Sequence, residues 1–423
     1  MNQMHRASSP RPRLIRGGHV VKGERSEAAD IVIAADGRIT AIGTKLTAPE
    51  GAEVIEAKGC LVSAGFVDMH QHLDKTGVLR FTPNPSGTLQ GAREAFARYA
   101  RTAPPEDVLN RASKTLALCL GHGTTAIRSH VNVDKDAGFN GIEALAQLRA
   151  DWADRVQLQL VGFMIPHPGQ DYDWLEANIG RAAQMADVLG GTIAVAEDPE
   201  RYLDIIFATA AERGLPVDLH MDEHLDAGRT HFSSVFKRVR RFGMQGRTVL
   251  SHVSVLSAMH HPNFQEIMDE ILALDIGLVT LPAANLYLQG RDARILPPRG
   301  LTRVAELIRG GAKLATASDN IEDPFVPTGS GDMLEIARWT LLAGHLKGDE
   351  LPLVYRMITE IPAGLMGLQD HGLAVGKRAD LVIARSHDVA TLVAGGAADL
   401  RVLSAGRLVS ERGLRQGADL CPA

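Results

Sequence analysis

The sequence lacks the features that mark secreted, disulfide-bonded and membrane-spanning proteins. Its three cysteines, Cys60, Cys119 and Cys421, are far apart and form no CxxC pair, so neither a disulfide framework nor a thiolate zinc site is indicated. No uncharged apolar run approaches the roughly 20 residues of a membrane span, and the basic N-terminal stretch is not followed by the apolar core of a signal peptide. We therefore expect a protein of the reducing cytoplasm with no membrane partner.

An excess of basic charge is missing as well. The 45 lysines and arginines are outnumbered by 50 aspartates and glutamates, which gives a formal net charge of −5. Without a basic stripe, we expect no nucleic-acid partner. The 423 residues, 45% of them hydrophobic, suffice for one large domain of roughly 250–300 residues and a smaller one. Residues 1–11 are predicted to form a flexible tail.

The two ends of the chain share a β-rich pattern. Residues 12–62 show short alternating strands with an Asp-Gly turn in "ADGR", and residues 372–420 repeat the pattern with "AGR" at the turn. We predict that both ends pair into one small, discontinuous β-sandwich domain.

Residues 63–371 show a different pattern, in which short apolar runs alternate with helical stretches. Such alternation is typical of repeated βα units around a parallel sheet. The runs are "CLVSAGFVDMH", "TTAIRSHVNV", "VQLQLVGFMI", "GTIAVA", "PVDLHMDE", "TVLSHVS", "IGLVTLPAANL" and "KLATASDN". Eight runs over this length predict an α/β fold with a (β/α)₈ TIM-type barrel.

Polar residues gather where these runs end, which is where a barrel of this kind carries its chemistry. The run ends hold His70 and His72, His130, His220 with Glu223, His252, and Asp319. A lone histidine there would more often be a structural residue, but chance does not readily reproduce the whole series. Side chains two apart on a strand share a face, so His70 and His72 point together. Three neutral imidazoles and one carboxylate suit Zn²⁺ or Fe²⁺ and leave a position open for water.

Several segments together resemble the amidohydrolase superfamily, and within it the group of cytosine deaminase and N-isopropylammelide isopropylaminohydrolase. They are "GFVDMHQHLDK", "RSHVNVD", "HMDEHLD", "SHVSVLS", "NLYLQGR", "GLAVGKRADLVI" and the long stretch around Asp319. The resemblance extends from residue 65 to beyond residue 380, and so covers nearly the whole chain.

The resemblance implies roles for individual residues. The expected ligands of the metal ion are His70, His72, His220 and Asp319. Asp319 also takes a proton from the metal's water, His252 steadies the attacking hydroxide, and Glu223 protonates a ring nitrogen. Binuclear members of the superfamily carry a bridging carbamylated lysine on the fourth strand, and "GTIAVAED" has no lysine, so one ion, Zn²⁺ or Fe²⁺, is expected per subunit.

These roles predict hydrolytic deamination of a small nitrogen heterocycle such as a pyrimidine, a triazine or a cyclic amidine. A divalent cation lowers the pKa of bound water from 15.7 toward ~7, which makes hydroxide available at neutral pH. Two alternatives stay open. The same site could open a cyclic amide or release an alkylamine, or the barrel could bind metal without catalysis. A homo-oligomer is a further possibility.

The predicted substrate-binding residues are Lys75, Ile165, Asp198 and Asn320. The resemblance places lysine and asparagine beside ligands in the triazine enzyme, although Lys75 could instead pair with Asp74, and Asp198 could cap a loop. Ile165 falls where cytosine deaminases carry a glutamine that reads the base, and an apolar side chain cannot make that hydrogen bond, which argues against cytosine itself. Conversely, the triazine enzyme lacks a glutamate at position 223. His130 is expected as a hydrogen bonder beneath the metal, and "NLYLQGR" as a segment that helps to close the site.

Overall fold

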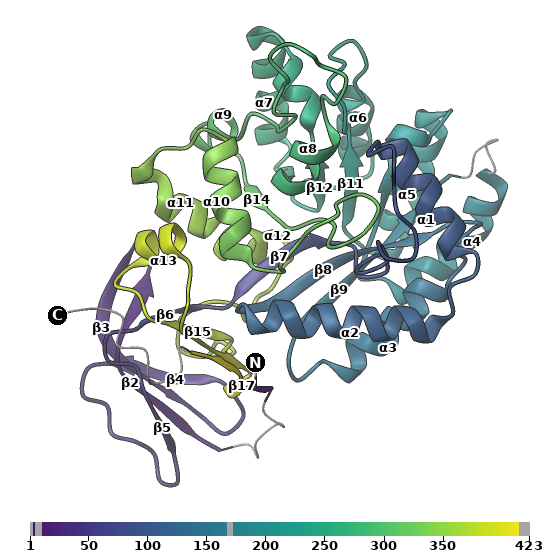
Figure 1. Ribbon diagram of the computed structural model, residues 1–423. Coiled ribbons are helices and arrows are strands. Elements are labelled where there is room, and N and C mark those ends of the chain that lie inside the picture. The colour runs from purple at the N-terminus through teal and green to yellow at the C-terminus, as the bar shows by residue number, and fades with distance from the viewer. Residues whose placement is uncertain (1–2, 5–10, 167–171, 414–423) are drawn as a thin grey trace.

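The computed structural model describes residues 3–4, 11–166 and 172–413, which form a large barrel and a small β domain (Figure 1). The barrel is a sheet of eight parallel strands in the order β14-β13-β12-β11-β10-β9-β8-β7. Its strands are β7 (Phe66–Gln71), β8 (Thr124–Val133), β9 (Gln157–Met164), β10 (Val188–Thr192), β11 (Val217–Met221), β12 (Thr248–His252), β13 (Gly277–Thr280) and β14 (Leu314–Thr316). Gln71 bridges to Asp319 just beyond β14, which closes the ring, so the predicted TIM-type barrel is confirmed.

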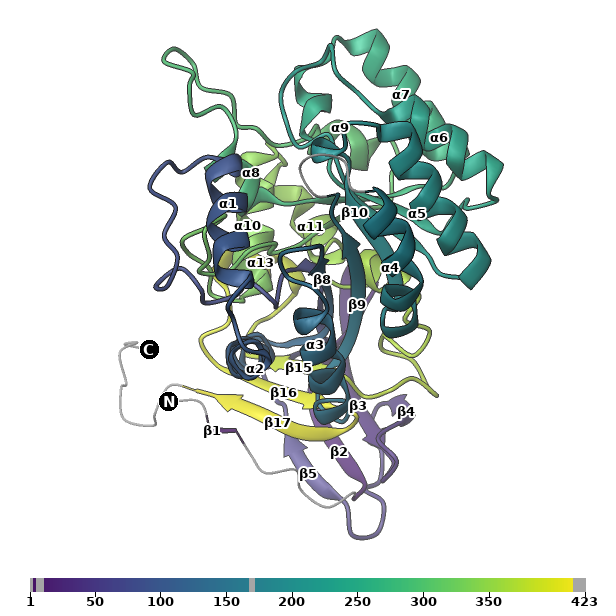
Figure 2. The same ribbon diagram turned by 90° about the vertical axis from the view of Figure 1, so that its right-hand side faces the viewer.

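Helices cover the outside of the barrel, and Figure 2 shows α2, α3 and α4 against β8 and β9. The α-helices are α1 (Leu89–Ala100), α2 (Pro105–Gly121), α3 (Asn140–Asp151), α4 (Tyr172–Met185), α5 (Pro199–Arg213), α6 (Phe232–Arg241), α7 (His261–Ala273), α8 (Pro282–Leu288), α9 (Val304–Arg309), α10 (Met333–Ala343), α11 (Leu351–Arg356), α12 (Glu360–Leu365) and α13 (Val389–Gly395). Short 3₁₀ turns are η1 (Ile193–Val195), η2 (Ser254–Ala258) and η3 (Gly348–Glu350).

Helix α5 illustrates why these segments fold locally as they do. The Asp198 side chain accepts a hydrogen bond from the backbone N–H of Arg201, Pro199 occupies the first turn, and Gly214 ends the helix in the left-handed conformation. Its buried residues, Tyr202, Leu203, Ile206, Phe207 and Ala210, follow the helical period and face the barrel core.

Both chain ends build the second sheet, in the order β1-β17-β16-β15-β6-β2-β3-β4, with β5 paired to β2. Its strands are β1 (Gln3–Met4), β2 (Arg13–Lys22), β3 (Arg25–Ile33), β4 (Ile39–Gly43), β5 (Glu53–Glu56), β6 (Leu61–Ala64), β15 (Leu381–Ala384), β16 (Leu400–Ser404) and β17 (Arg407–Arg412). The register of β2 shifts between Ile15 and Gly18, and β2 pairs first with β5 and then with β6. The sheet therefore folds around a core of its own that includes Ile31 and Leu381, as the predicted β-sandwich requires.

Several observed elements begin or end at residues other than the limits of the predicted runs. The first apolar run splits at Gly65 into β6 and β7, so the domain limit predicted at residues 62/63 falls inside β6. The fourth strand is Val188–Thr192, and residues 193–195 of the predicted run form η1 instead. Within the tail predicted over residues 1–11, Gln3–Met4 pairs with β17. The rest of that tail up to residue 10, and the end of the second segment from residue 414, lie outside the described residues.

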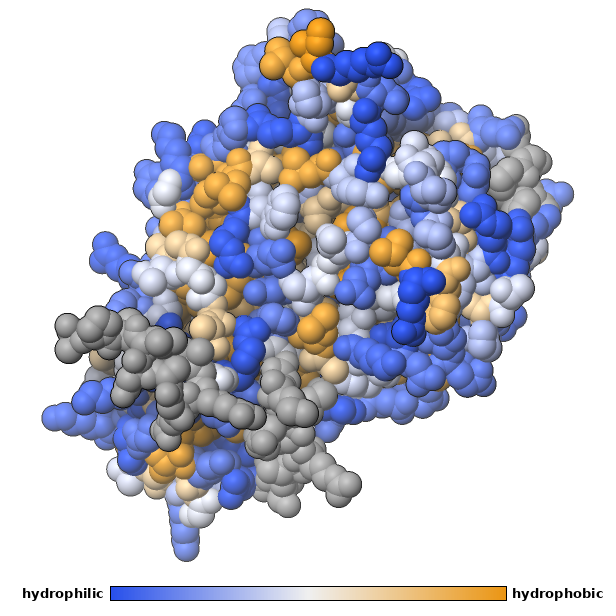
Figure 3. All heavy atoms as spheres, viewed as in Figure 1, coloured by the Kyte–Doolittle hydropathy of each residue, from blue (hydrophilic) through white to orange (hydrophobic). Residues whose placement is uncertain are grey.

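The surface in Figure 3 mixes hydrophilic residues with separate hydrophobic patches. Among the described helices, none is both long and apolar enough to cross a membrane.

Candidate active site

Four predicted metal ligands come together where three barrel strands end. His70 and His72 leave the end of β7, His220 belongs to β11, and Asp319 follows β14. One ligand atom from each lies within 4.8 Å of all the others, and all four residues are buried. The Nε2 atom of His72 lies 3.2 Å from Nε2 of His220 and 3.3 Å from Oδ1 of Asp319, and Nε2 of His70 lies 3.6 Å from the same oxygen.

This donor set fits a divalent cation. Nε2 of His70 and Oδ1 of Asp319 are buried without a hydrogen-bond partner among the described residues, and such atoms are costly unless something binds them. Burial, followed by the neighbouring cationic groups, holds the pKa of His70 and His72 well below the usual value. The imidazoles are therefore neutral, the form in which histidine binds metal.

Outer contacts fix the orientation of the histidines. Nδ1 of His70 lies 2.9 Å from the Ser251 hydroxyl, which donates to Oδ1 of Asp218 at 3.1 Å. Nδ1 of His72 lies 3.1 Å from the backbone carbonyl of His130. With Nδ1 engaged in each ring, Nε2 is left to face the shared centre.

Sequence reasoning missed Ser251 and Asp218, although a signal was present. Asp218 lies two residues before His220 on β11, so both side chains share one face of the strand. His130 packs against His70 with 3.9 Å between ring centroids, and its Nε2 lies 3.8 Å from Asp218. Asp218 is already paired with Arg128 at 2.8 Å.

Glu223 and His252 lie beside the ligand cluster. Nδ1 of His252 is 3.7 Å from the Glu223 carboxylate, and Nε2 is 3.9 Å from Asp319. Burial raises the pKa of Glu223 to about 8, opposed by Arg93 and assisted by Asp319. Burial likewise lowers the pKa of His252 to about 4 and raises that of Asp319 to about 6. A neutral imidazole therefore lies between the Glu223 carboxyl group and the ligand Asp319.

The backbone at two of these positions is unusual. Asp319 and His252 have φ values of 63° and 67°, in the left-handed region that residues other than glycine seldom occupy. The backbone N–H of Asp319 donates to the carbonyl of His70 at 2.9 Å, which ties the eighth strand to the first at the ligands. Such strained conformations concentrate at functional sites.

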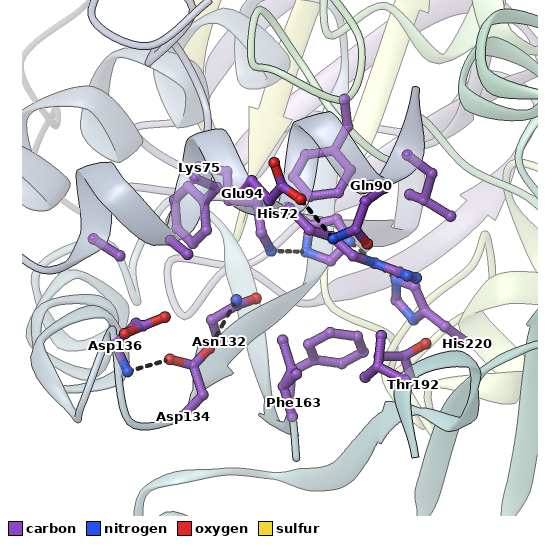
Figure 4. A pocket seen from close by; sticks show the side chains of 18 of the residues that line it. His72, Lys75, Gln90, Glu94, Asn132, Asp134, Asp136, Phe163, Thr192 and His220 are labelled. Atoms are coloured by element: carbon purple, nitrogen blue, oxygen red, sulfur yellow. Dashed lines mark hydrogen bonds between the residues drawn. The ribbon is translucent and has the colours of Figure 1, made fainter. Parts of the chain in front are cut away.

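A cavity of about 510 Å³ opens above the cluster. Figure 4 shows Lys75, Gln90, Phe163 and His220 among the side chains around it. Three of the predicted substrate-binding residues, Lys75, Ile165 and Asn320, line this cavity.

Lys75 lies between several partners. Its Nζ is 2.8 Å from Nδ1 of His72 and 3.7 Å from Asp74, so the alternative pairing with Asp74 is also present. The ammonium group also lies 5.1 Å and 5.7 Å from the ring centroids of Phe96 and Phe163. This places a cation next to both a metal ligand and the cavity.

Asn320 and Asp198, the other polar residues predicted to bind substrate, differ in their relation to the cavity. The Asn320 amide donates to Asp323 at 2.6 Å, and Asp323 also accepts two backbone N–H groups. Asp198, by contrast, is not among the described residues that line the cavity. Its side chain caps α5, so the capping alternative describes its place, and the proposed contact with substrate is not supported.

Helix α8 brings two further contacts that sequence reasoning missed. The amide of Asn285 lies 3.0 Å from Nδ1 of His252, and the amide of Gln289, just after the helix, donates to the backbone carbonyl of Glu223 at 3.0 Å. Both residues belong to "NLYLQGR", the segment expected to help close the site. The sequence indicated the segment but not which side chains touch the site.

Comparison with known proteins places these features in context. Residues 53–140 and 102–409 match the Amidohydrolase family. A pterin deaminase of Rhizobium rhizogenes (strain K84) is 32% identical over 386 residues, which cover 90% of this chain and 87% of that protein. An N-isopropylammelide isopropyl amidohydrolase of Pseudomonas sp. (strain ADP) is 30% identical over 94% of this chain and 96% of its own length. The structure of 5-methylcytosine deaminase from Klebsiella pneumoniae, liganded with 5-fluorocytosine, aligns with a TM-score of 0.87 at 28% identity, covering 95% of this chain and 98% of that chain.

Proposed function

Because the chain belongs to the amidohydrolase family, we propose that it hydrolytically removes an amino group from a small nitrogen heterocycle and requires one divalent metal ion, Zn²⁺ or Fe²⁺. The relatives named above are a deaminase of pterin, a deaminase of 5-methylcytosine and an amidohydrolase of N-isopropylammelide. Their shared chemistry is cleavage of a carbon–nitrogen bond on a ring.

The observation that carries this proposal is the buried Glu223 carboxyl group. It lines the cavity, lies 3.7 Å from His252, and has a pKa raised by burial to about 8. Deamination of an aromatic ring requires a proton on a ring nitrogen while the amino-bearing carbon is attacked, and a carboxyl group that stays protonated at neutral pH can supply it.

The ligand cluster would hold the ion through His70, His72, His220 and Asp319. When bound, a divalent cation supplies a Lewis acid and brings the pKa of its water toward neutrality. Asp319 would accept a proton from the attacking water, and His252 would hydrogen-bond to the oxygen that adds to the ring carbon. Glu223 would donate its proton to the ring nitrogen and recover one from the hydroxyl group of the adduct as the carbonyl forms. The amine would leave as ammonia with the proton that Asp319 took up.

A single ion is supported by the surroundings of the cluster. The second set of donors, His70, His130 and Asp218, also lies within 4.8 Å, but Asp218 forms a buried ion pair with Arg128. No lysine occurs in β10, Val188–Thr192, so this strand cannot supply the carbamylated lysine that bridges two ions in binuclear members of the superfamily.

A second candidate function is release of an alkylamine from the same kind of ring. It is favoured by the similarity to N-isopropylammelide isopropyl amidohydrolase. Glu223 argues for deamination, because the resemblance described above gives the triazine enzyme no glutamate at this position.

The test is a substrate screen with the metal-loaded protein. We expect ammonia and an intact ring from at least one member of a panel of aminopyrimidines, aminotriazines, aminopurines and pterins, measured by coupled ammonia assay and mass spectrometry. Release of an alkylamine or a ring-opened product would favour the second candidate or a ring-opening reaction instead.

Glu223→Gln tests the proton donor directly. We expect metal binding to persist and kcat to fall at least about a hundredfold, as is usual for the loss of a general acid. Glu266→Gln is the matched control, because Glu266 is exposed on α7. An unchanged kcat in Glu223→Gln would rule out the donor role.

A further inference from the structure

Arg93 brings a positive charge to the cavity from helix α1. The helix buries Ala92, Ala95 and Phe96, and Arg93 lies next to this stripe, half-buried, among the residues that line the cavity. It forms no hydrogen bond or ion pair with any other residue in the described part of the chain. No sequence motif pointed to it, because it lies in a helix without ligand-like spacing.

The other nitrogen donors of the cavity differ from Arg93 in this respect. Each of Lys75, Gln90, Arg101, Asn132 and Asn320 has a polar protein partner between 2.6 and 3.2 Å away. Arg98, one turn and a half further along α1, is exposed to solvent. Arg93 is thus the half-buried donor that is still free to bind a ligand within the described cavity.

The charge of Arg93 acts on the reacting end of the cavity. Burial raises the pKa of Glu223 and lowers that of His252, and the charge of Arg93 lowers both pKa values. Burial also lowers the pKa of Arg93 itself, although a guanidinium group remains protonated at any physiological pH. Removing a cation from water without giving it a hydrogen-bond acceptor is unfavourable. The folded protein therefore carries an uncompensated desolvation free energy at Arg93, which a bound acceptor would offset.

We propose that Arg93 is a specificity-determining residue that binds an oxygen acceptor of the substrate, either a ring carbonyl or a carboxylate, next to the ring nitrogen that Glu223 protonates. This assignment rests on the proposed function of the same site. The planar guanidinium offers two parallel N–H donors, a geometry that matches such oxygens. Ile165 lines this cavity with an apolar side chain, so its side chain cannot recognise ring oxygens and donors such as Arg93 can.

Binding of deaminated analogues separates recognition from catalysis, because these compounds have no amino group to lose. The probes are lumazine-6-carboxylate, lumazine and 2-hydroxypteridine, with uracil-5-carboxylate, uracil and 4-pyrimidinone as the single-ring set. The first member of each set carries a carboxylate, the second only the additional ring carbonyl, and the third neither. Dissociation constants are measured by calorimetry on the metal-loaded protein and its Arg93→Gln and Arg93→Lys variants.

We expect Arg93→Gln to weaken binding of the probes that carry the carboxylate or the additional ring carbonyl roughly 10- to 100-fold, the range for a charged hydrogen bond, and to change binding of the third probe less than about twofold. Arg93→Lys should give an intermediate loss of affinity, because lysine keeps the positive charge but lacks the two parallel N–H donors of the guanidinium group. A loss limited to the carboxylate probes identifies a carboxylate as the partner, and an equal loss with the carbonyl probes identifies the ring carbonyl. Arg294→Gln removes an exposed charge and serves as the control.

Three results would overturn the assignment: equal weakening of all three probes, no weakening of any, or no binding of the first two probes of either set to the wild-type protein. Thermal unfolding provides a check on folding, since loss of an unpartnered charge should leave the melting temperature unchanged or higher. If the probes bind as expected but no amino counterpart releases ammonia, the proposed deamination fails while the role of Arg93 stands.

Discussion

Among single residues, His220 gives the most direct test of the metal centre, because its Nε2 atom faces that of His72 at 3.2 Å. Replacement by alanine removes one of four donors, so we expect His220→Ala to lose stoichiometric metal and ammonia release together. Metal content is measured by mass spectrometry. His261→Ala, at an exposed histidine on α7, is the control, and retention of one metal ion per chain by His220→Ala would remove His220 from the ligand set.

The pKa of Glu223 sets the expected pH dependence of turnover. Burial raises this pKa to about 8, so the carboxyl group is protonated below about pH 8 and loses its proton above it. A proton donor acts only in its protonated form. We therefore expect kcat/KM to fall as the pH rises above about 8, roughly tenfold per pH unit, measured at substrate concentrations well below KM between pH 6 and 10. A flat profile to pH 10, with the protein still folded by circular dichroism, would contradict this.

For single residues, the sequence was most informative about the metal ligands and least informative about the side chains that surround the substrate. The HxH pair, His220 and Asp319 were predictable because each falls at a strand end, and the barrel brings strand ends together. Arg93 and Asn285 were not, because each reaches the site from a helix whose placement depends on tertiary packing. Asp198 looked equally suitable for substrate binding and for capping, and only the structure assigns it to the helix.

At the scale of elements, β10 depends on two glycines that allow close packing. A Cβ atom on Gly190 would lie 2.0 Å from the carbonyl oxygen of Asp218 and 2.8 Å from the Val161 side chain. We therefore expect Gly190→Ala to destabilise the protein by roughly 1–3 kcal/mol, as overpacked cores do. Unfolding in urea measures the change.

The matched control for this substitution is Gly348→Ala, where an added Cβ meets nothing within 4 Å. An unchanged midpoint for Gly190→Ala would show that β10 tolerates the methyl group. The same glycines explain why the fourth strand was misplaced along the sequence. Val188–Thr192 holds two apolar residues and two glycines, so the more apolar stretch that follows it gave the stronger strand pattern.

At the scale of the whole molecule, Asp380 joins the two domains. Its carboxylate accepts hydrogen bonds from the backbone of Ala405 and the side chain of Arg378 in the small domain, and from Gln157 on barrel strand β9 at 2.9 Å. Asp380 is buried, so its removal leaves several donors without an acceptor. We expect Asp380→Ala to cost roughly 3–5 kcal/mol, the range for breaking a buried ion pair.

Chemical denaturation with probes in both domains measures this effect. Asp370→Ala is the control, because Asp370 pairs with Arg38 at the surface, and surface pairs contribute roughly 0–1 kcal/mol. If Asp380→Ala costs no more than Asp370→Ala, the contact does not couple the domains.

The seam of the barrel has a consequence for biosynthesis. Asp319 meets His70 where the last strand joins the first, so the donors of one centre come from opposite ends of the barrel sequence. A chain emerging from the ribosome therefore has no complete coordination sphere until its eighth strand is free to dock. A chain that ends before Asp319 would therefore carry the HxH pair without a complete set of ligands.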